Sequence, residues 1–344
     1  MSPFSLTFLV AFILSLALSP LAAVLSRRLG ITAVPGGRRQ HARPVPKLGG
    51  VVLYIAFVAA VILAQLLPVE RGDPNESIRL TGLLIGGTVL LIAGLLDDIF
   101  ELSPLPQFLI QLVAAAIAIS NLIIIEYVNN PLTGEWTSQF PTWFTVLFTA
   151  VWLVGMTNTV NWLDGLDGLA AGVTAIAAVV LFINAAYRLD PPQESVALLP
   201  IALLGATLGF LPYNFFPARL FIGGSALWLG YTVGALSIIG GAKMAAVLLV
   251  MGGPILDVGW QVISRVRRGR NPTVGDRGHL HFRLQDIGIS QRKIVMAYYA
   301  FCAFFGMLTL VVSSRLFKLI AMAVMVAIVV GVLYWLTRVM EDEQ

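Results

Sequence analysis

Residues 80–98 are LTGLLIGGTVLLIAGLLDD, an apolar run that ends in two adjacent aspartates. The span predicted around this run, residues 78–96, is long enough as a helix, at about 1.5 Å per residue, to cross a hydrocarbon core about 30 Å thick. Comparable apolar runs occur along the whole chain, at residues 3–25, 48–68, 105–125, 140–157, 166–187, 195–212, 226–242, 244–263, 293–313 and 318–337. The sequence therefore predicts an all-α polytopic membrane protein with about eleven transmembrane helices.

The composition of the 344-residue chain indicates the same fold class. Apolar residues make up 58% of the chain and charged residues 12%, and the mean hydropathy is +0.87. A cytosolic globular enzyme is excluded, because a water-soluble domain needs a larger charged surface. The single cysteine, Cys302, cannot form an intrachain disulfide. No compositional break or clear repeat divides the chain, so we treat residues 1–344 as one integral-membrane domain.

The basic residues indicate which side of the membrane each loop faces. The net charge is +4, but Lys and Arg lie in short loops between apolar runs, so a membrane surface explains them better than a nucleic-acid partner. With eleven spans the loops alternate, and the set that contains loops 26–47 and 264–292 carries most of the 22 Lys and Arg. The positive-inside rule then predicts an outside N-terminus, a cytoplasmic C-terminus and a functional site on the cytoplasmic side.

Two aspartates end the third predicted span on this cytoplasmic side. Negative charge at the C-terminus of a helix opposes the helix dipole, and the adjacent carboxylates of Asp97 and Asp98 repel each other. A bound cation would relieve both costs. A solvated helix end is the plainer interpretation of the pair taken alone.

Residues 158–168, NTVNWLDGLDG, repeat a polar residue at every third position. If this stretch is helical, three polar side chains share one face: Asn158, Asn161 and Asp164. Gly165 and Gly168 would allow a turn whose backbone comes close to a ligand. N-capping of the next helix would explain Asp164 or Asp167, but not all four polar side chains.

Residues 276–283, DRGHLHFR, alternate His and Arg and so offer hydrogen-bond donors suited to phosphate oxygens. Solvated loop residues explain this segment about as well, whereas a zinc site is weaker because no cysteine lies near. Carboxylates that favour a divalent cation and basic loops that favour phosphate occur together at the height of lipid headgroups. This combination indicates Mg²⁺-dependent phosphoryl transfer to a lipid.

Several motifs also follow the order found in one known family: residues 35–50, 97–104, 158–168, 214–223, 253–257 and 276–284. On these motifs the chain resembles the bacterial polyprenyl-phosphate N-acetylhexosamine-1-phosphate transferases. The resemblance is strongest to the branch that moves GlcNAc-1-phosphate from UDP-GlcNAc to undecaprenyl phosphate. It implies a multi-pass enzyme of the bacterial plasma membrane, whose product initiates cell-envelope glycan synthesis and whose other product is UMP.

The resemblance also implies roles for individual residues. It assigns a catalytic role to Asp97, Asp98, Asp164, His279 and His281. It implies a bound Mg²⁺, with Mn²⁺ as an alternative, whose expected ligands are Asp97, Asp98, Asp164 and Asp167. It assigns substrate binding, including uracil stacking on Phe221 and phosphate binding by the basic residues, to Asn158, Asn161, Gly165, Asp167, Phe221, Arg277, Arg283 and His41.

The chain differs from the family pattern at a few positions. Gly224 stands near the place of a metal-ligating Asp, Gln107 replaces a Lys, Phe282 replaces a third His, and Ala33 replaces a common Asp. A degenerate member that binds lipid phosphate or nucleotide sugar with little turnover is therefore a second hypothesis. A secondary transporter is a third and weaker one, because its acids should lie near the bilayer midplane. The oligomeric state stays open, a homodimer included.

Overall fold

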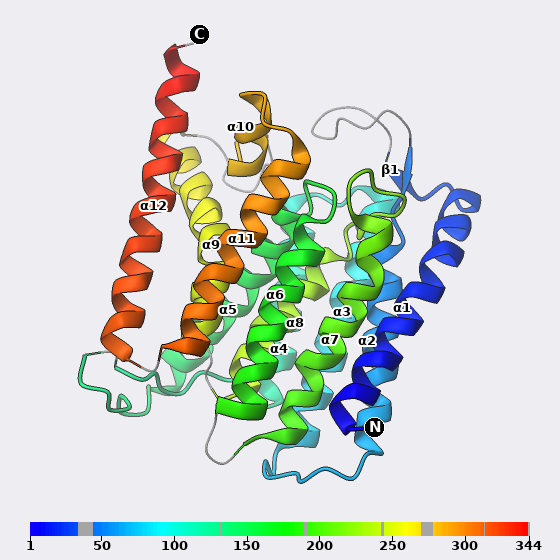
Figure 1. Cartoon of the computed structure of the whole chain (residues 1–344), viewed down its shortest axis with the longest axis vertical. Coiled ribbons are helices and arrows are strands. Elements are labelled where there is room, and N and C mark those ends of the chain that lie inside the picture. The colour runs from blue at the N-terminus through cyan, green and yellow to red at the C-terminus, as the bar shows by residue number, and fades with distance from the viewer. Residues whose placement is uncertain are drawn as a thin grey trace.

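The computed structural model describes residues 1–33, 44–130, 132–188, 192–241, 244–269, 278–312 and 314–342. In these ranges the chain forms a bundle of long helices that run between two ends of the molecule (Figure 1). The helices are α1 (Pro3–Arg28), α2 (Gly49–Gln65), α3 (Glu76–Phe100), α4 (Pro104–Ser120), α5 (Thr142–Leu163), α6 (Leu169–Ile183), the π-helical turn η1 (Asn184–Arg188), α7 (Glu194–Asn214), α8 (Ala226–Ile239), α9 (Met244–Arg267), α10 (Leu280–Asp286), α11 (Gln291–Val311) and α12 (Arg315–Asp342).

Each predicted span overlaps an apolar helix, so the expectation of an all-α polytopic membrane protein is confirmed. Within the described residues, eight helices are long and apolar enough to cross a membrane: α1, α3, α5, α6 with η1, α7, α9, α11 and α12. The helices α2, α4 and α8 are apolar but shorter. The number of crossings and the orientation of the termini stay predictions.

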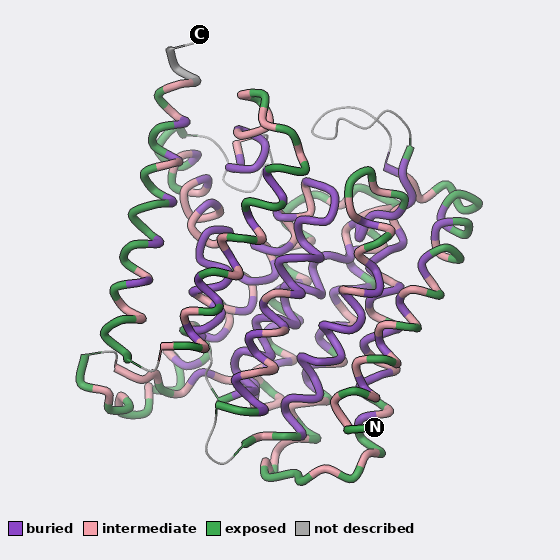
Figure 2. The backbone as a smooth tube through the Cα atoms, viewed as in Figure 1, coloured by how far each residue is buried: buried purple, intermediate pink, exposed green. Residues whose placement is uncertain are grey.

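Burial separates central helices from peripheral ones (Figure 2). In the most apolar window of α7, 83% of residues are buried inside the bundle, whereas the corresponding share is 22% in α1 and in α12. The exposed faces of α1 and α12 remain apolar, with side chains such as Ile13, Leu21, Ile320 and Val324. A large apolar exterior of this kind fits lipid rather than water as the surrounding solvent.

Glycines allow the peripheral helix α1 to pack closely on the central helix α7. A Cβ atom added at Gly205 would lie 2.4 Å from the carbonyl oxygen of Phe8, and one added at Gly209 would lie 2.3 Å from that of Phe12. Contacts this short exist because glycine has no side chain, as in small-residue interfaces between membrane helices.

The two ends of the bundle carry different elements (Figure 1). The N-terminus and the α2–α3 and α4–α5 loops lie at one end. The C-terminus, α10 and a short antiparallel pair formed by β1 (Thr32–Ala33) and β2 (Val45–Pro46) lie at the other, which we call the α10 end. Three described segments singled out by the sequence lie at the α10 end: the last turn of α3, the α5–α6 turn and the segment that forms α10.

Candidate active site

The loop between α7 and α8 connects several segments at the α10 end. The backbone N–H groups of Gly49 and Gly50, at the start of α2, donate to the carbonyls of Phe221 and Ile222 at 2.8 and 3.0 Å. The same loop contacts the end of α3 and the α5–α6 turn through two carboxylates. It therefore fixes the positions of segments that are far apart in the sequence.

Asp98 lies in the last turn of α3 and is bound by this loop. Its Oδ2 accepts a hydrogen bond from the backbone N–H of Gly224 at 2.9 Å. Its Oδ1 lies 3.4 Å from Nζ of Lys47, and the Asp98 side chain is only 5% exposed. Gly223 has a φ of +78°, and a Cβ atom there would lie 2.3 Å from Asp98 Oδ2, so the loop needs glycine at this point. Lys47 thus supplies a cation next to the acidic end of α3.

The neighbouring carboxylate, Asp97, is bound from α4. Nε2 of Gln107 donates to Asp97 Oδ1 at 2.7 Å and to the carbonyl of Leu102 at 3.0 Å. A neutral amide therefore stands where the family pattern has a lysine. The acidic pair is split between two partners, a cation for Asp98 and an amide for Asp97.

Asp167, in the α5–α6 turn, is held by the same α7–α8 loop. Its side chain is buried, and its Oδ2 accepts from the backbone N–H of Ala218 at 2.9 Å. Its Oδ1 is also buried and has no hydrogen-bond partner among the described residues. Asp98 and Asp167 are thus brought to one loop, and one carboxylate oxygen is left for a ligand.

Neither candidate carboxylate caps α6. The residue before the helix is Gly168, with a φ of +80°, and its N–H donates to Oδ1 of Asn214 at 3.1 Å. Asp164 instead ends α5, as the residue that follows Leu163. The capping interpretation of Asp164 and Asp167 is therefore wrong, because the N-cap residue of α6 is Gly168.

The two asparagines of the same motif lie on α5, as the spacing predicts. Asn158 exchanges two hydrogen bonds with Gln111 of α4, at 2.6 and 3.3 Å. Asn161 lies one turn closer to the α10 end, in the last turn of α5. A side-chain amide pair therefore connects α4 to α5 directly behind the turn that carries Asp164.

The histidine segment is anchored by an aspartate of α9. Nδ1 of His279 lies 3.0 Å from Oδ2 of Asp257, and the N–H of Leu280 donates to Asp257 Oδ1 at 2.9 Å. The side chains of Asp257 and His279 are both buried. An ionised carboxylate can only accept, so this contact places a proton on Nδ1 and leaves Nε2 as the other functional nitrogen.

The histidine segment also packs on the α5–α6 turn. A Cβ atom at Gly165 would lie 2.6 Å from Nε2 of His281 and 2.7 Å from Cζ of Phe282. The rings of His279 and His281 are stacked, with centroids 5.8 Å apart, and the indole of Trp162 lies 5.2 Å from His279. Contacts therefore run without a break from the α3 carboxylates through the α7–α8 loop to the imidazoles.

Comparisons with known proteins indicate the family of the chain. The family model described as glycosyl transferase family 4 matches residues 80–241. A probable undecaprenyl-phosphate N-acetylglucosaminyl 1-phosphate transferase of Bacillus subtilis is 30% identical, over 89% of this chain and 84% of that protein. The chain belongs to glycosyl transferase family 4.

Other relatives in family 4 cover the chain to a similar extent. A decaprenyl-phosphate N-acetylglucosaminephosphotransferase of Mycobacterium leprae is 32% identical, over 86% of this chain and 80% of that protein. A phospho-N-acetylmuramoyl-pentapeptide-transferase of Moorella thermoacetica is 34% identical, over 85% of this chain and 92% of that protein. The similarity to family 4 thus extends well beyond the matched model.

Some predicted substrate-binding residues of this family 4 chain have other partners in the structure. Phe221 is buried beside Ala33 and Val45, and its role in uracil stacking stays a prediction. The guanidinium of Arg283 donates to Oγ1 of Thr337 at 2.8 Å, which connects α10 to α12. Two further candidates lie outside the described residues: His41 and Arg277.

The side chains of the candidate site can be compared with the ligands that Mg²⁺ usually has in proteins. Among the described residues, no group of three or more His, Cys, Asp or Glu side chains gathers closely enough to hold a metal ion. Mg²⁺ is commonly bound by one or two carboxylates together with substrate phosphates and water, so it does not need such a cage. The buried, unpartnered Oδ1 of Asp167 fits a role of this kind.

Two residues at the site had no role in the sequence analysis. Asp257 lies inside the apolar helix α9, and a carboxylate in such a position is itself a signal of function. Lys47 was one basic residue among many in the first long loop, and its proximity to Gly49 and Gly50 gave no indication of an aspartate partner. Its contact with Asp98 depends on the folded position of α3.

Proposed function

We propose that this family 4 chain transfers an N-acetylhexosamine 1-phosphate, most simply GlcNAc-1-phosphate, from a UDP-sugar to undecaprenyl phosphate or another polyprenyl phosphate. UMP is the second product. One observation carries the proposal: Asp98 and Asp167 are held by one loop, beside buried imidazoles, in a chain whose relatives are named as transferases of this type. The lipid-linked product would begin the synthesis of a cell-envelope glycan.

The proposal includes a location for the site. The chain would lie in the bacterial plasma membrane with eleven crossings, α2, α4 and α8 among them, and the α10 end would face the cytoplasm. The excess of Lys and Arg in the loops of that end supports this orientation through the positive-inside rule. The acceptor phosphate would then approach from the headgroup layer, and the nucleotide from the aqueous side.

The reaction is an in-line displacement at the β-phosphorus of the UDP-sugar. An oxygen of the lipid phosphate forms a bond to that phosphorus, and the bond to the bridging oxygen breaks, so UMP leaves with the electron pair. A phosphate monoester has a second pKa near about 6, so the nucleophile is already mostly dianionic at pH 7. The protein therefore needs to position the phosphates and neutralise their charge more than to remove a proton.

Residues of the chain can meet both needs. The ammonium of Lys47, which is 17% exposed next to Asp98, attracts a phosphate. His279, fixed through Nδ1 by Asp257, presents Nε2 toward the diphosphate together with His281. Mg²⁺, or Mn²⁺ in its place, would be held by one or two of the four aspartates together with the substrate phosphates, with Oδ1 of Asp167 as the oxygen that no other group occupies. The ion would screen the repulsion between the two anionic substrates.

The proposal is tested with the purified full-length protein, undecaprenyl phosphate and UDP-GlcNAc, by measuring UMP release with Mg²⁺ and with EDTA. We expect release with Mg²⁺ and a loss of about 100-fold or more in Asp98→Asn and in His279→Ala, because each removes a group that acts on the transition-state charge. Glu101→Gln, at an exposed position just after α3, is the matched control. Full activity in either site variant, or in EDTA, would refute the assigned roles.

A second candidate function, binding with little turnover, is favoured by Gly224. A Cβ atom at this position would lie 2.5 Å from the carbonyl oxygen of Gly94 in α3, so a metal-ligating side chain has no room there. Calorimetric binding of UDP-GlcNAc without any UMP release, across a titration of Mg²⁺ and Mn²⁺, would support this candidate over the first.

A further inference from the structure

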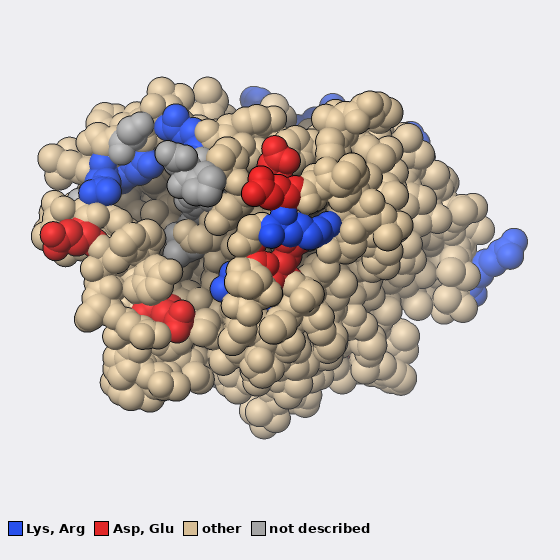
Figure 3. Space-filling view, turned by 90° about the horizontal axis from the view of Figure 1, so that it is seen from below, with Lys and Arg blue, Asp and Glu red and all other residues tan. Residues whose placement is uncertain are grey.

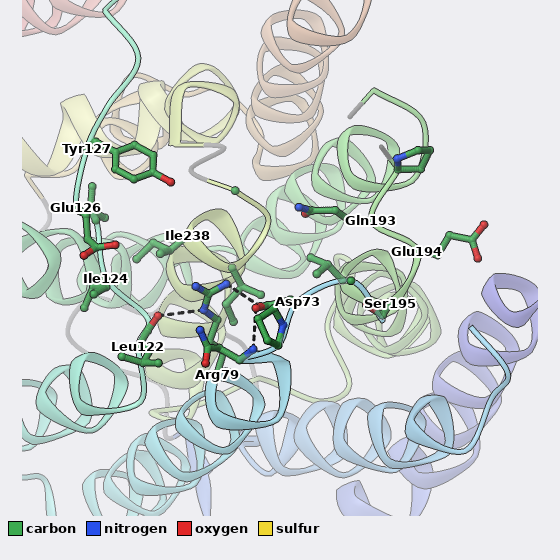
Figure 4. A pocket seen from close by; sticks show the side chains of 18 of the residues that line it. Asp73, Arg79, Leu122, Ile124, Glu126, Tyr127, Gln193, Glu194, Ser195 and Ile238 are labelled. Carbon is green, nitrogen blue, oxygen red and sulfur yellow. Dashed lines mark hydrogen bonds and ion pairs between the residues drawn. The ribbon is translucent and has the colours of Figure 1, made fainter. Parts of the chain in front are cut away.

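A pocket of about 700 Å³ lies at the end of the bundle opposite to α10 (Figure 4). Its walls come from the α2–α3 loop, the α4–α5 loop, the start of α7 and the end of α8. Its volume is within the range of small-molecule sites in proteins. None of the candidate catalytic residues lines it.

The short helix α8 ends at the bottom of the pocket. A helix of 14 residues is about 21 Å long, less than the roughly 30 Å of a hydrocarbon core. Its last residues, Ile238 and Ile239, contribute an apolar part of the lining, next to the start of α3, the residues that follow α4 and the start of α7. The pocket therefore opens at the surface and extends down to the end of α8.

Hydrogen-bonding groups face the centre of the pocket from opposite walls. In Figure 4, Tyr127 and Gln193 lie on opposite sides of the pocket, and the hydroxyl of Tyr127 and the amide of Gln193 both point inward. Arg79 and Asp73 lie between them. Oε1 of Gln193 is buried and has no hydrogen-bond partner among the described residues, so no such contact fixes the orientation of the amide, and its pocket-facing end can donate to or accept from a ligand. Arg79 is a donor, so a matching ligand must also accept hydrogen bonds.

The charges in the lining select against anions. Arg79 is neutralised by Asp73, whose Oδ2 lies 2.7 Å from Nη1 of the guanidinium. Glu70 and Glu126 also line the pocket, whereas Figure 4 shows the carboxylate of Glu194 directed away from it. These acids repel an anionic ligand. Figure 3, seen from this end, shows acidic and basic side chains gathered in a few groups on an otherwise uncharged face.

Aromatic rings complete the wall formed by the α4–α5 loop. The rings of Tyr127 and Trp136 are packed edge to face, with centroids 5.0 Å apart, and both are about half exposed. Half-exposed aromatic rings offer flat apolar faces next to a polar tip. A ligand that carries hydroxyl groups around its edge and C–H groups on its faces matches such a wall.

We propose that this pocket, formed by Tyr127, Gln193, Arg79 and the end of α8, binds a neutral saccharide of about disaccharide size. Hydroxyl groups both donate and accept, so a saccharide matches the amide of Gln193, the hydroxyl of Tyr127 and those Arg79 donors that Leu122 and Asp73 do not occupy. A metal ion does not match, because no three His, Cys, Asp or Glu side chains gather anywhere in the described residues. The site is independent of the proposed transferase reaction.

The test is saturation-transfer NMR on the full-length protein in lipid nanodiscs, because sugar-headed detergents would compete. The probes are maltose and N,N′-diacetylchitobiose, with glucuronate and choline as charged comparisons. We expect at least one disaccharide to bind and neither ion to displace it. Gln193→Leu should weaken binding about tenfold, which corresponds to about 1.4 kcal/mol. Gln65→Leu, at an exposed position outside the lining, is the matched control.

The results distinguish binding in this pocket from binding at another site. Because Gln193→Leu removes an unsatisfied buried oxygen, the variant should fold, and its thermal midpoint will verify this. No binding of either disaccharide would overturn the proposal. Equal binding of choline or glucuronate, or unchanged affinity in Gln193→Leu, would also overturn it, since the signal would then come from another site, such as the one for UDP-sugars.

Discussion

The contact between Asp257 and His279 is the best-defined side-chain pair at the candidate active site. Both side chains are buried, their polar atoms are 3.0 Å apart, and the second oxygen of Asp257 accepts from the backbone of Leu280. A single carboxylate therefore fixes the ring and the start of α10 together. We propose that Asp257 positions His279 rather than contacting the substrate.

Replacing this carboxylate tests the positioning role. Asp257→Asn keeps an oxygen that can accept from Leu280 but loses the charge that holds Nδ1 of His279. We expect kcat/KM for UMP release to fall about 10- to 100-fold, as for the loss of a charge-assisted hydrogen bond of roughly 1.5–3 kcal/mol. Asp286→Asn, at an exposed position of α10, should retain activity. Equal activity in both variants would show that His279 needs no such support.

The sequence identified the acidic side chains of the site but not their partners. Asp98 and Asp167 stand out because carboxylates are rare in apolar runs. Their partners, Gly224 and Ala218, contribute backbone N–H groups, which almost every residue type possesses. No pattern of side chains reveals such a contact before the fold is known. The sequence also did not show that the N-cap residue of α6 is Gly168 rather than an aspartate.

At the scale of elements, long apolar runs were sufficient to locate the long helices. The predicted run at residues 166–187 corresponds to α6 and η1, although its start belongs to the α5–α6 turn. The helix α10 was not predicted, because Leu280–Asp286 is too short to show a helical period among polar neighbours. Hydropathy therefore finds segments that must avoid water, and it does not find short helices held by tertiary contacts.

The packing of α1 on α7 provides a test at this scale. A methyl group at Gly209 would meet the backbone of α1, 2.3 Å from the carbonyl oxygen of Phe12, and a backbone atom cannot yield as a side-chain end can. We expect Gly209→Ala to lower stability by about 1–3 kcal/mol, the usual cost of overpacking. The measurement is the thermal midpoint in detergent.

The matched control for this test is Gly155→Ala in α5. No atom outside the neighbouring backbone lies within 4 Å of a Cβ atom there, so this variant should unfold at the temperature of the parent protein or slightly above it. A similar loss in both variants would mean that helix propensity, and not the α1–α7 contact, determines the change.

At the scale of the whole molecule, polar chemistry is divided between the two ends of an apolar bundle. The carboxylates and imidazoles of the candidate active site lie toward the α10 end, and the pocket proposed to bind a saccharide lies at the other. The central helices α6, α7 and α8 separate them. If the bundle spans a membrane, these two ends face different compartments.

Cysteine labelling tests which compartment each end faces. The single native cysteine, Cys302, is buried and can be replaced by alanine to give a background without thiols. Into this background we place Glu135→Cys, in the exposed α4–α5 loop, or Asp286→Cys, at an exposed position of α10. Because loops rich in Lys and Arg stay in the cytoplasm, we expect a membrane-impermeant maleimide to label Glu135→Cys in intact cells and Asp286→Cys only after lysis. The reverse pattern would place the candidate active site outside, where a cytoplasmic nucleotide sugar cannot reach it, and the proposed reaction would fail with the orientation.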